Sequence, residues 1–180
     1  TLLGDCAVAV NPKDKRYSHL SGKNVKLPLT GRTIPVIFDK YVDMEFGTGC
    51  VKVTPSHDPN DREIADRHPE IEQDRGIIDQ KGKMTPLAGK EYGGLGRYDC
   101  RKKVIKDLGS EDQGGLGLLE KTEPYKNAVG VCYRCSTVIE SLDSLQWFLD
   151  MKKMAKAAAA AGRDGRVKFF PESWLKSYLN

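Results

Sequence analysis

The sequence predicts an α+β fold, in which a mainly antiparallel β-barrel carries helices on its surface and is followed by a small helical appendage. Three observations support this prediction. Residues 1–54 alternate between apolar and polar side chains with the period of two that is typical of strands. Later segments have helical periodicity. The composition then shifts near Gly130, just before a Cys-x-x-Cys pair. We therefore expect a barrel domain over residues 1–128 and the appendage over residues 129–180.

Four strands are expected in the N-terminal part of the chain, because β-branched and alternating residues are bounded there by turn-forming residues. These strands are Cys6–Val10, Asn24–Leu29, Thr33–Phe38 and Gly49–Thr54. The tight connection Thr30-Gly31-Arg32 predicts a hairpin between the second and third strands. A further hairpin at the edge of the barrel is expected from residues 77–79 and 81–84.

The first helix is expected over residues 60–68, where the period of the sequence changes. Asn60 or Asp61 can cap its N-terminus, because a short polar side chain there accepts a hydrogen bond from an unpaired backbone amide. Ile64 and Ala65 are expected to face inward.

Two further helices are expected farther along the chain. One covers residues 99–108, with Asp99 as its cap and Gly109 as its stop. The other covers residues 144–161, after a short strand over residues 137–140. Its spacing predicts one apolar face, made of Trp147, Phe148, Met151, Met154 and Ala155.

The composition excludes several classes of protein. Apolar residues make up 39% and charged residues 30% of the 180 residues, which is typical of a soluble globular domain and not of a disordered or membrane-spanning chain. The net charge of +4 permits contact with nucleic acid without arguing for it. Five cysteines without a secretion signal argue against a disulfide framework and for the reducing cytoplasm. Both ends of the chain are expected to be cuts through a longer protein.

The segment Phe46–Asp61 has the composition of a small polar binding site. Gly47 and Gly49 allow the backbone to approach a ligand closely. The alternation of the strand that follows them places Lys52 and Thr54 on one face. This stretch therefore combines a flexible turn with a polar strand face, which is what a small binding pocket needs.

His57, Asp58 and Asp61 follow this strand, where the first helix begins. Only one of the two carboxylates can cap the helix, so the other is left for a ligand. An ordinary strand followed by a capped helix accounts for the same residues without any ligand. The residues alone leave both interpretations open.

The same residues resemble the central motif of the editing domain of valyl-tRNA synthetases. The resemblance rests on Phe46-Gly47-Thr48-Gly49, Lys52-Val53-Thr54-Pro55 and His57-Asp58-x-x-Asp61. The isoleucyl pattern has a glycine in place of Asp58 and the leucyl pattern lacks Lys52, so both residues favour the valyl family. The resemblance covers nearly the whole chain, from Leu3-Gly4-Asp5 through Gly94-Leu95-x-Arg97 to Gln146-Trp147-Phe148.

The resemblance implies a β-barrel of the type that valyl, isoleucyl and leucyl editing domains share, inserted into a Rossmann-type synthetic domain. It also implies hydrolysis of threonine wrongly attached to tRNA(Val), with threonyl adenylate as a second substrate. An apolar pocket rejects an isostere with an added hydroxyl by only about a hundredfold, so a second, polar site is needed. Two alternatives stay open: a non-catalytic module that binds the tRNA acceptor end, and the editing domain of an isoleucyl-tRNA synthetase.

By this resemblance, a few polar residues carry the chemistry. Asp61 anchors the ammonium group of the misattached amino acid. Asp58 and Thr54, together with Thr1, read the side-chain hydroxyl and hold the attacking water. Lys52 neutralises a phosphate or stabilises the developing oxyanion. The family's arginine-containing segment lies just before Thr1, so the pocket of this chain is expected to be incomplete.

Four other residues are expected to line the site. Phe46 offers a face on which the terminal adenine can stack. Gly47 and Thr48 belong to the same turn and are expected to contact the substrate there. His57 acts either as a general base or as a turn residue that orients Asp58, and the two roles are equally supported.

No cofactor is expected in the editing domain, and ATP is expected only in the synthetic domain of the full enzyme. Cys132 and Cys135 are expected to form half of a zinc site in the full enzyme, because structural zinc takes four ligands and the resemblance puts the other pair upstream. The expected partners are the acceptor end of tRNA(Val), its threonyl or valyl group, and the rest of the synthetase chain. We expect a cytoplasmic monomer without membrane contact.

The second expected helix carries a cluster of basic residues. This cluster consists of Arg97, Arg101, Lys102, Lys103 and Lys106. It holds tRNA phosphates or is an ordinary solvated helix face, and the charge pattern alone favours the solvated face.

Overall fold

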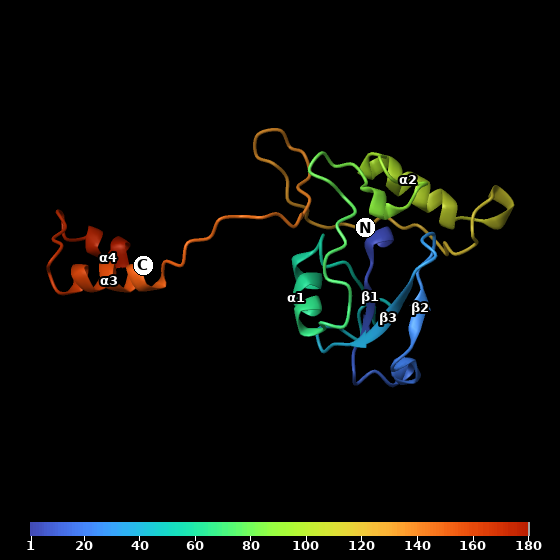
Figure 1. Ribbon diagram of the computed structural model, residues 1–180, viewed down its shortest axis with the longest axis horizontal. Helices are drawn as coiled ribbons and strands as arrows, with labels where there is room; N and C mark the ends of the chain where they lie inside the picture. Colours follow the sequence, from blue (N-terminus) through green and yellow to red (C-terminus); the bar gives the residue numbers. More distant parts are fainter. Residues whose placement is uncertain (180) are drawn as a thin grey trace. The chain divides into compact units, whose positions relative to one another are not determined.

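The computed structural model describes residues 1–179 (Figure 1). It contains four strands: β1 (Ala7–Val10), β2 (Asn24–Lys26), β3 (Thr33–Phe38) and β4 (Cys50–Val53). The α-helices are α1 (Pro59–Arg67), α2 (Arg97–Leu108), α3 (Lys152–Arg163) and α4 (Trp174–Leu179). Short 3₁₀ turns are η1 (Leu2–Gly4), η2 (Lys15–Leu20), η3 (Pro86–Ala88) and η4 (Glu111–Gln113). The chain divides into two compact units, Thr1–Asp143 and the part from Ser144 onward, and each is described by itself.

The four strands form one sheet in the order β2-β3-β1-β4. β1 lies parallel to β3, with Val8 opposite Val36, and antiparallel to β4, with Val8 opposite Lys52. β2 and β3 form the predicted antiparallel hairpin, with Val25 opposite Ile34. The α+β class and the mainly antiparallel pairing are therefore confirmed.

The predicted closed barrel is not confirmed, because this sheet is open and its edge strands β2 and β4 do not pair. Barrels close with more strands than these four. The second strand ends early, since Leu29 has a left-handed backbone with φ of 65°. The expected hairpin of residues 77–84 is only one bridge, between Ile78 and Met84. There the carboxylate of Asp79 accepts hydrogen bonds from the backbone amides of Lys81 and Lys83, which favours a turn over regular pairing of two strands.

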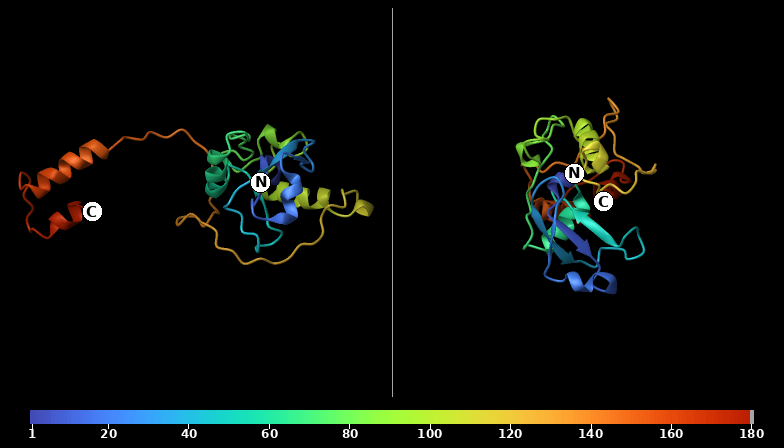
Figure 2. Two further views of the ribbon diagram at one scale, coloured as in Figure 1. Left: turned by 90° about the horizontal axis from the view of Figure 1, so that it is seen from below. Right: turned by 90° about the vertical axis from the view of Figure 1, so that its right-hand side faces the viewer.

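Helix α1 covers one face of the sheet (Figures 1 and 2). Ile64 and Ala65 are fully buried against Ala9 of β1 and Val53 of β4, as predicted from their spacing. The helix begins one residue earlier than expected, because Asp58 and neither Asn60 nor Asp61 caps it. This packing fixes the end of β4 next to the first turn of α1.

Helix α2 belongs to a second apolar cluster, in which Cys100 packs with Leu3, Ile77 and Met84. The helix ends at Gly109 as predicted. The predicted cap Asp99 is wrong: the helix begins earlier, with Gly96 in the cap position. The bridge between Lys83 and Gly96 holds that start in place.

Little regular structure is present between α2 and α3. The predicted strand over residues 137–140 is a single bridge between Val131 and Val138. The third helix begins at Lys152, so Trp147 and Phe148 precede it and do not form the predicted apolar face. Alanine has the highest helix propensity, and the helix coincides with the alanine-rich run rather than with the aromatic residues before it.

Within the second unit, α3 and α4 pack closely. A Cβ on Gly162 would lie 3.1 Å from the ring of Tyr178 and 3.2 Å from Leu175, so the absence of a side chain permits the contact. The rings of Phe169 and Tyr178 lie 4.7 Å apart. None of the helices formed by residues 1–179 is long and apolar enough to cross a bilayer.

Candidate functional site

The end of β4 and the first turn of α1 bring three of the predicted residues together. Asp61 Oδ2 accepts hydrogen bonds from Lys52 Nζ at 2.6 Å and from the backbone amide of Thr54 at 2.9 Å. Asp61 is 4% exposed, and Thr54 is fully buried. The side chain of Lys52 is 45% exposed, so this lysine links a buried carboxylate to solvent.

Only one of the two carboxylates at the start of α1 caps the helix, as expected. Asp58 Oδ1 accepts from the backbone amide of Asn60 at 2.8 Å and is the cap. Asp61 is the carboxylate left over, and it turns inward. It is not free, because Lys52 and Thr54 already occupy its Oδ2.

Asp5 completes this group and was missed by the sequence analysis as a site residue. Thr54 Oγ1 donates to Asp5 Oδ1 at 2.6 Å, and Asp5 is 3% exposed. Burial raises the pKa of Asp5 to about 6, although the bond from Thr54 and the charge of Lys52 act in the other direction. An acid beside the buried Leu3 and Cys6 was the signal that could have found it. Asp5, Lys52, Thr54 and Asp61 are called the buried polar network below.

His57 connects two loops next to this network. Its Nε2 accepts from the backbone amide of Ile77 at 2.9 Å, so the ring hydrogen is on Nδ1, which lies 3.2 Å from the carbonyl oxygen of Ser141. Burial lowers the pKa of His57 below its usual range, which favours the neutral ring. Both ring nitrogens are therefore engaged within the fold, which favours the turn role over the general base.

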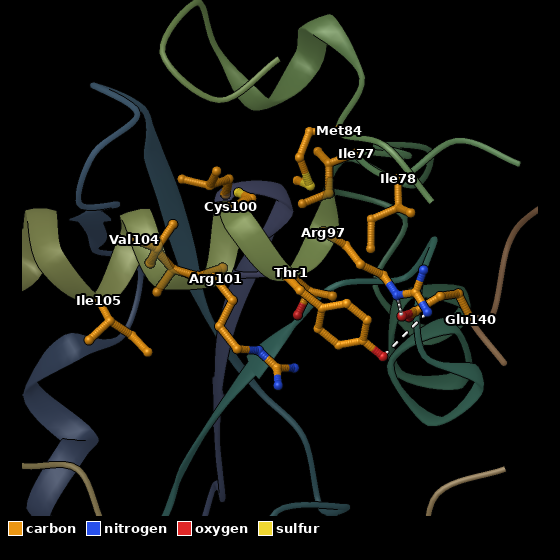
Figure 3. A pocket seen from close by; sticks show the side chains of 13 residues that line it. Thr1, Ile77, Ile78, Met84, Arg97, Cys100, Arg101, Val104, Ile105 and Glu140 are labelled. Carbon is orange, nitrogen blue, oxygen red and sulfur yellow. Dashed lines mark hydrogen bonds and ion pairs between the residues drawn. The ribbon is translucent and has the colours of Figure 1, made fainter. Parts of the chain in front are cut away.

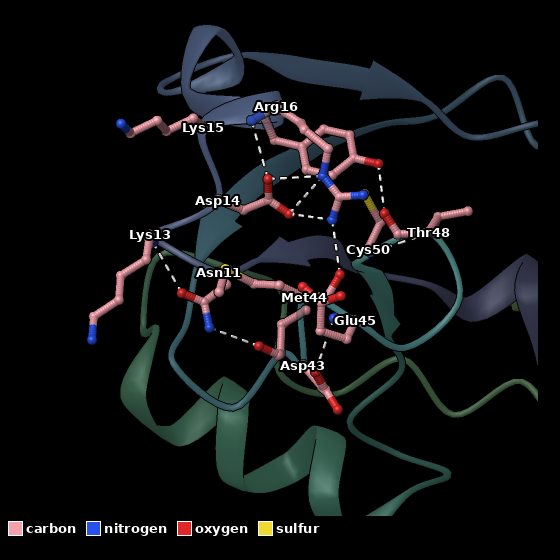
Figure 4. Close-up of polar contacts among 12 residues, drawn as sticks. Asn11, Lys13, Asp14, Lys15, Arg16, Asp43, Met44, Glu45, Thr48 and Cys50 are labelled. Atoms are coloured by element: carbon pink, nitrogen blue, oxygen red, sulfur yellow. Dashed lines mark hydrogen bonds and ion pairs between the residues drawn. The ribbon is translucent and has the colours of Figure 1, made fainter.

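The predicted glycine turn forms a surface loop, Asp43–Gly49, which is called the glycine loop below. Figure 4 shows Arg16 between the carboxylate of Asp14 and this loop. Arg16 Nη2 donates to Asp14 Oδ2 at 2.6 Å and to the carbonyl oxygen of Met44 at 2.8 Å. Tyr17 Oη donates to the carbonyl oxygen of Thr48 at 2.7 Å. Side chains of the η2 segment thus hold the loop from outside.

Phe46 lies in the glycine loop and is 69% exposed, so its ring is available to a ligand. Gly47 and Thr48 are also exposed. Gly49 has φ of 75°, and a Cβ there would lie 2.6 Å from Arg16 Nη2. Glycine at this position lets the loop lie directly against Arg16.

Thr1 lies beside a cavity of about 150 Å³ (Figure 3). Its lining is largely apolar, including Ile77 and Met84, and also contains Arg97 and Arg101. Burial lowers the pKa of the Thr1 amino group, and the nearby charges of Asp5 and Lys52 act on it in opposite directions.

The basic residues of α2 are largely paired with acids. Arg97 forms an ion pair with Glu140 at 2.5 Å, and Lys103 lies 3.0 Å from Asp107. Lys102 lies 3.8 Å from Asp99. These pairs favour the solvated helix face over a phosphate-binding cluster.

Cys132 and Cys135 lie in a turn closed by the bond from the Ser136 amide to the Cys132 carbonyl oxygen. The hydrogen bond with Thr137 Oγ1, 3.2 Å from Cys135 Sγ, lowers the pKa of the Cys135 thiol. Within residues 1–179, no group of three or more histidine, cysteine or acidic side chains is arranged to hold a metal. The two thiols are only two of the four ligands that a structural zinc ion takes.

Two comparisons with known proteins concern this part of the chain. A family model described as "Leucyl-tRNA synthetase, editing domain" matches residues 9–94, which include the glycine loop and the start of α1. Over the whole chain, the Valine--tRNA ligases of Thermotoga maritima, Carboxydothermus hydrogenoformans and Symbiobacterium thermophilum are 54%, 53% and 52% identical. The chain spans about a fifth (19–20%) of the length of these relatives. Over its whole length, this chain is therefore similar to a segment of valyl-tRNA synthetases, and the editing-domain model matches within that segment.

Proposed function

We propose that this chain hydrolyses the ester of threonine wrongly attached to tRNA(Val), with threonyl adenylate as a second substrate. The observation that carries the proposal is the contact between Asp61 and Lys52, in which a buried carboxylate already holds a primary ammonium group at 2.6 Å. The misattached amino acid offers the same chemical group. The substrate ammonium binds Asp61 in this proposal, either beside Lys52 or in its place.

Lys52 supplies positive charge to the reacting ester. When a substrate ammonium takes up Asp61, the lysine side chain is free to move toward the ester oxygen or a neighbouring phosphate. Its 45% exposure is consistent with such a movement, because the ammonium group already lies near solvent. Thr54 is fully buried, so a substrate reaches its hydroxyl only after neighbouring side chains move.

Selectivity for threonine over valine follows from the polarity of this site. Thr54, Asp58 and Thr1 are the groups that we propose to bond the threonine hydroxyl and the attacking water. Valine has the same shape but no hydroxyl, and it would leave these groups without hydrogen-bond partners. Unpaired polar groups cost about 1–3 kcal/mol each, which is enough for a strong preference.

The glycine loop is proposed to hold the terminal adenosine of the tRNA. Phe46 supplies a ring for stacking, with Gly47 and Thr48 beside it, and its 69% exposure supports this role. His57 is proposed to keep the start of α1 in place through its bonds to Ile77 and Ser141, without acting as a base.

The wider assignments rest on the relatives. We propose residues 1–128 as the editing region and tRNA(Val) and the rest of a synthetase chain as partners, in a cytoplasmic monomer. The barrel of the full domain is proposed to need strands beyond the four described here. We further propose that Cys132 and Cys135 bind zinc together with a second cysteine pair of the full enzyme. ATP chemistry belongs to the synthetic domain and not to these residues.

A second candidate is a non-catalytic module that binds the tRNA acceptor end. The engagement of both His57 nitrogens and the full burial of Thr54 favour it, because neither group is free to act on a water molecule in this conformation. The two candidates differ in whether the ester is cleaved.

The test compares the deacylation of Thr-tRNA(Val) with that of Val-tRNA(Val). The measured quantity is the release of the labelled amino acid. We expect cleavage of the threonyl ester at least about a hundredfold faster, in line with the two or more hydrogen bonds that valine cannot make. Tight binding of both tRNAs without cleavage would replace the hydrolase by the binding module. Equal cleavage of both esters would contradict the proposed selectivity.

A further inference from the structure

The buried polar network contains a carboxylate to which the proposed function gives no task. Asp5 lies between η1 and β1 and is 3% exposed. Its Oδ1 accepts the hydrogen of Thr54 Oγ1 at 2.6 Å. Among the described residues, no side-chain hydrogen bond uses its Oδ2. Asp5 therefore lies behind Thr54 with half of its carboxylate unpaired.

The charges around Asp5 do not balance it. Lys52 of β4 is the nearby side-chain cation, and it is bonded to Asp61 of α1 at 2.6 Å. Arg32 donates to the backbone oxygen of Asp5 at 3.0 Å, but its guanidinium pairs with Glu72 at 2.8 Å. Among the side chains, two buried carboxylates thus share one lysine ammonium. The Thr1 amino group also acts on Asp5, but burial disfavours the charged form of that group.

We propose, resting on the function proposed above, that Asp5 is a positioning residue of the editing site: its unbalanced charge behind Thr54 selects substrates that carry a free α-ammonium group. An ammonium bound at Asp61 then lies near two carboxylates instead of one. Attraction between charges is strong where water is excluded. The site would therefore discriminate against acyl groups without an amino group.

Asp5 also sets the direction of the Thr54 hydrogen bond. An ionised carboxylate accepts hydrogen bonds and cannot donate, so Thr54 Oγ1 must donate to it. The remaining lone pairs of Thr54 Oγ1 can then only accept, and a substrate hydroxyl or a water molecule would be the donor. Asp5 thereby fixes how Thr54 takes part without touching the substrate.

The charge of Asp5 destabilises the fold, which separates this inference from a purely structural role. Its pKa is raised from 3.8 to about 6, so the neutral form favours folding. The stability that this form provides is present below pH 3.8 and is lost as the pH rises through about 6. Asp5→Asn keeps an acceptor for Thr54 without the charge. We expect it to raise the Tm at pH 8, whereas loss of a structural carboxylate would lower it.

The experiment measures binding of two adenosine analogues by calorimetry at pH 7. One carries threonine through an amide in place of the ester, and the other carries a 3-hydroxybutanoyl group, which lacks the α-amino group. We expect the wild-type chain to prefer the amino analogue by about a hundredfold and Asp5→Asn by only about tenfold, because the variant lacks the second negative charge near the bound ammonium. Asp5→Glu keeps the charge and should keep most of the preference.

The pH dependence supplies a second readout. Between pH 7 and pH 5, the wild-type chain should lose affinity for the amino analogue as Asp5 takes up a proton, and Asp5→Asn should lose less. His57 and the Thr1 amino group also face this region and have lowered pKa values. Both groups are present in both proteins, so the difference between the two curves isolates Asp5.

Each outcome bears on the inference separately from the proposed function. If the wild-type chain binds the amino analogue and Asp5→Asn shows the same preference and the same pH dependence, the inference is wrong and the proposed function stands. An unfolded or less stable Asp5→Asn also overturns the inference. That result would show that the Asp5 carboxylate stabilises the fold, whereas the inference expects its charge to destabilise it. A wild-type chain that binds neither analogue would contradict both proposals.

Discussion

The buried polar network and the glycine loop hold their functional groups in opposite ways. Asp61 and Thr54 are at most 4% exposed and are fixed by packing between β4 and α1. Phe46 is 69% exposed and depends on clamps outside its own loop, made by Arg16 and Tyr17. The buried polar network therefore places charged groups inside the fold, whereas the glycine loop places the apolar ring of Phe46 on the surface.

This difference predicts different consequences of mutation. A change in the network removes partners from buried polar groups, so it should affect both stability and catalysis. A change at the tip of the loop removes only an exposed side chain and should affect substrate binding alone.

Asp61→Ala should have the largest effect. It removes the proposed ammonium anchor and leaves the buried amide of Thr54 without its acceptor. We expect deacylation of Thr-tRNA(Val) to fall by more than about a hundredfold and the free energy of unfolding to fall by about 1–3 kcal/mol. Kinetics and urea denaturation measure the two quantities. Asp66→Ala, at an exposed position of the same helix, is the control and should change neither. Activity retained in Asp61→Ala would remove the anchor from the proposal.

Phe46→Ala should raise the KM for Thr-tRNA(Val) by about tenfold, because stacking of a base on an aromatic ring contributes about 1–3 kcal/mol. The kcat and the free energy of unfolding should stay nearly unchanged, since the ring is exposed. Phe46→Trp keeps an aromatic face and should restore the KM. Tyr41→Ala removes another exposed ring, just before the loop, and serves as the control. A loss of kcat with unchanged KM would contradict the stacking role.

Gly49→Ala and Gly47→Ala form a matched pair in the glycine loop. Both glycines have positive φ, so each substitution brings backbone strain of about 1 kcal/mol. Only the Cβ at Gly49 also meets Arg16, whereas Gly47 faces open space. We therefore expect Gly49→Ala to lower the free energy of unfolding by about 1 kcal/mol more than Gly47→Ala does. Equal losses, measured by denaturation, would mean that the Arg16 clamp does not hold the loop.

Much of the fold was predictable because its signals are local. β3 has the predicted bounds, and Ile64 and Ala65 face inward, since alternation and helical spacing act over a few residues. The motif also placed Lys52, Thr54 and Asp61 in one site region, and the structure brings these three together. A polar strand face followed at once by a helix start leaves few arrangements of these side chains.

Other features depend on contacts that the sequence does not reveal locally. Asp5 is far from Thr54 in sequence, and only the pairing of β1 with β4 brings them together. The parallel pairing of β1 with β3 and the turn made by Asp79 could not be predicted from periodicity. The barrel prediction was not confirmed because the edge strands β2 and β4 do not pair with each other. The spacing of Trp147 and Phe148 imitated a helix face, although both are almost fully exposed and precede α3.

The most direct test of the account is a crystal structure of this chain with the threonyl amide analogue of adenosine. We expect the α-ammonium to lie within hydrogen-bond distance of Asp61, Lys52 to have moved, and the adenine to stack on Phe46. An analogue bound elsewhere, for example in the cavity lined by Ile77 and Arg97, would contradict it, since neither the buried polar network nor the glycine loop would then hold the substrate.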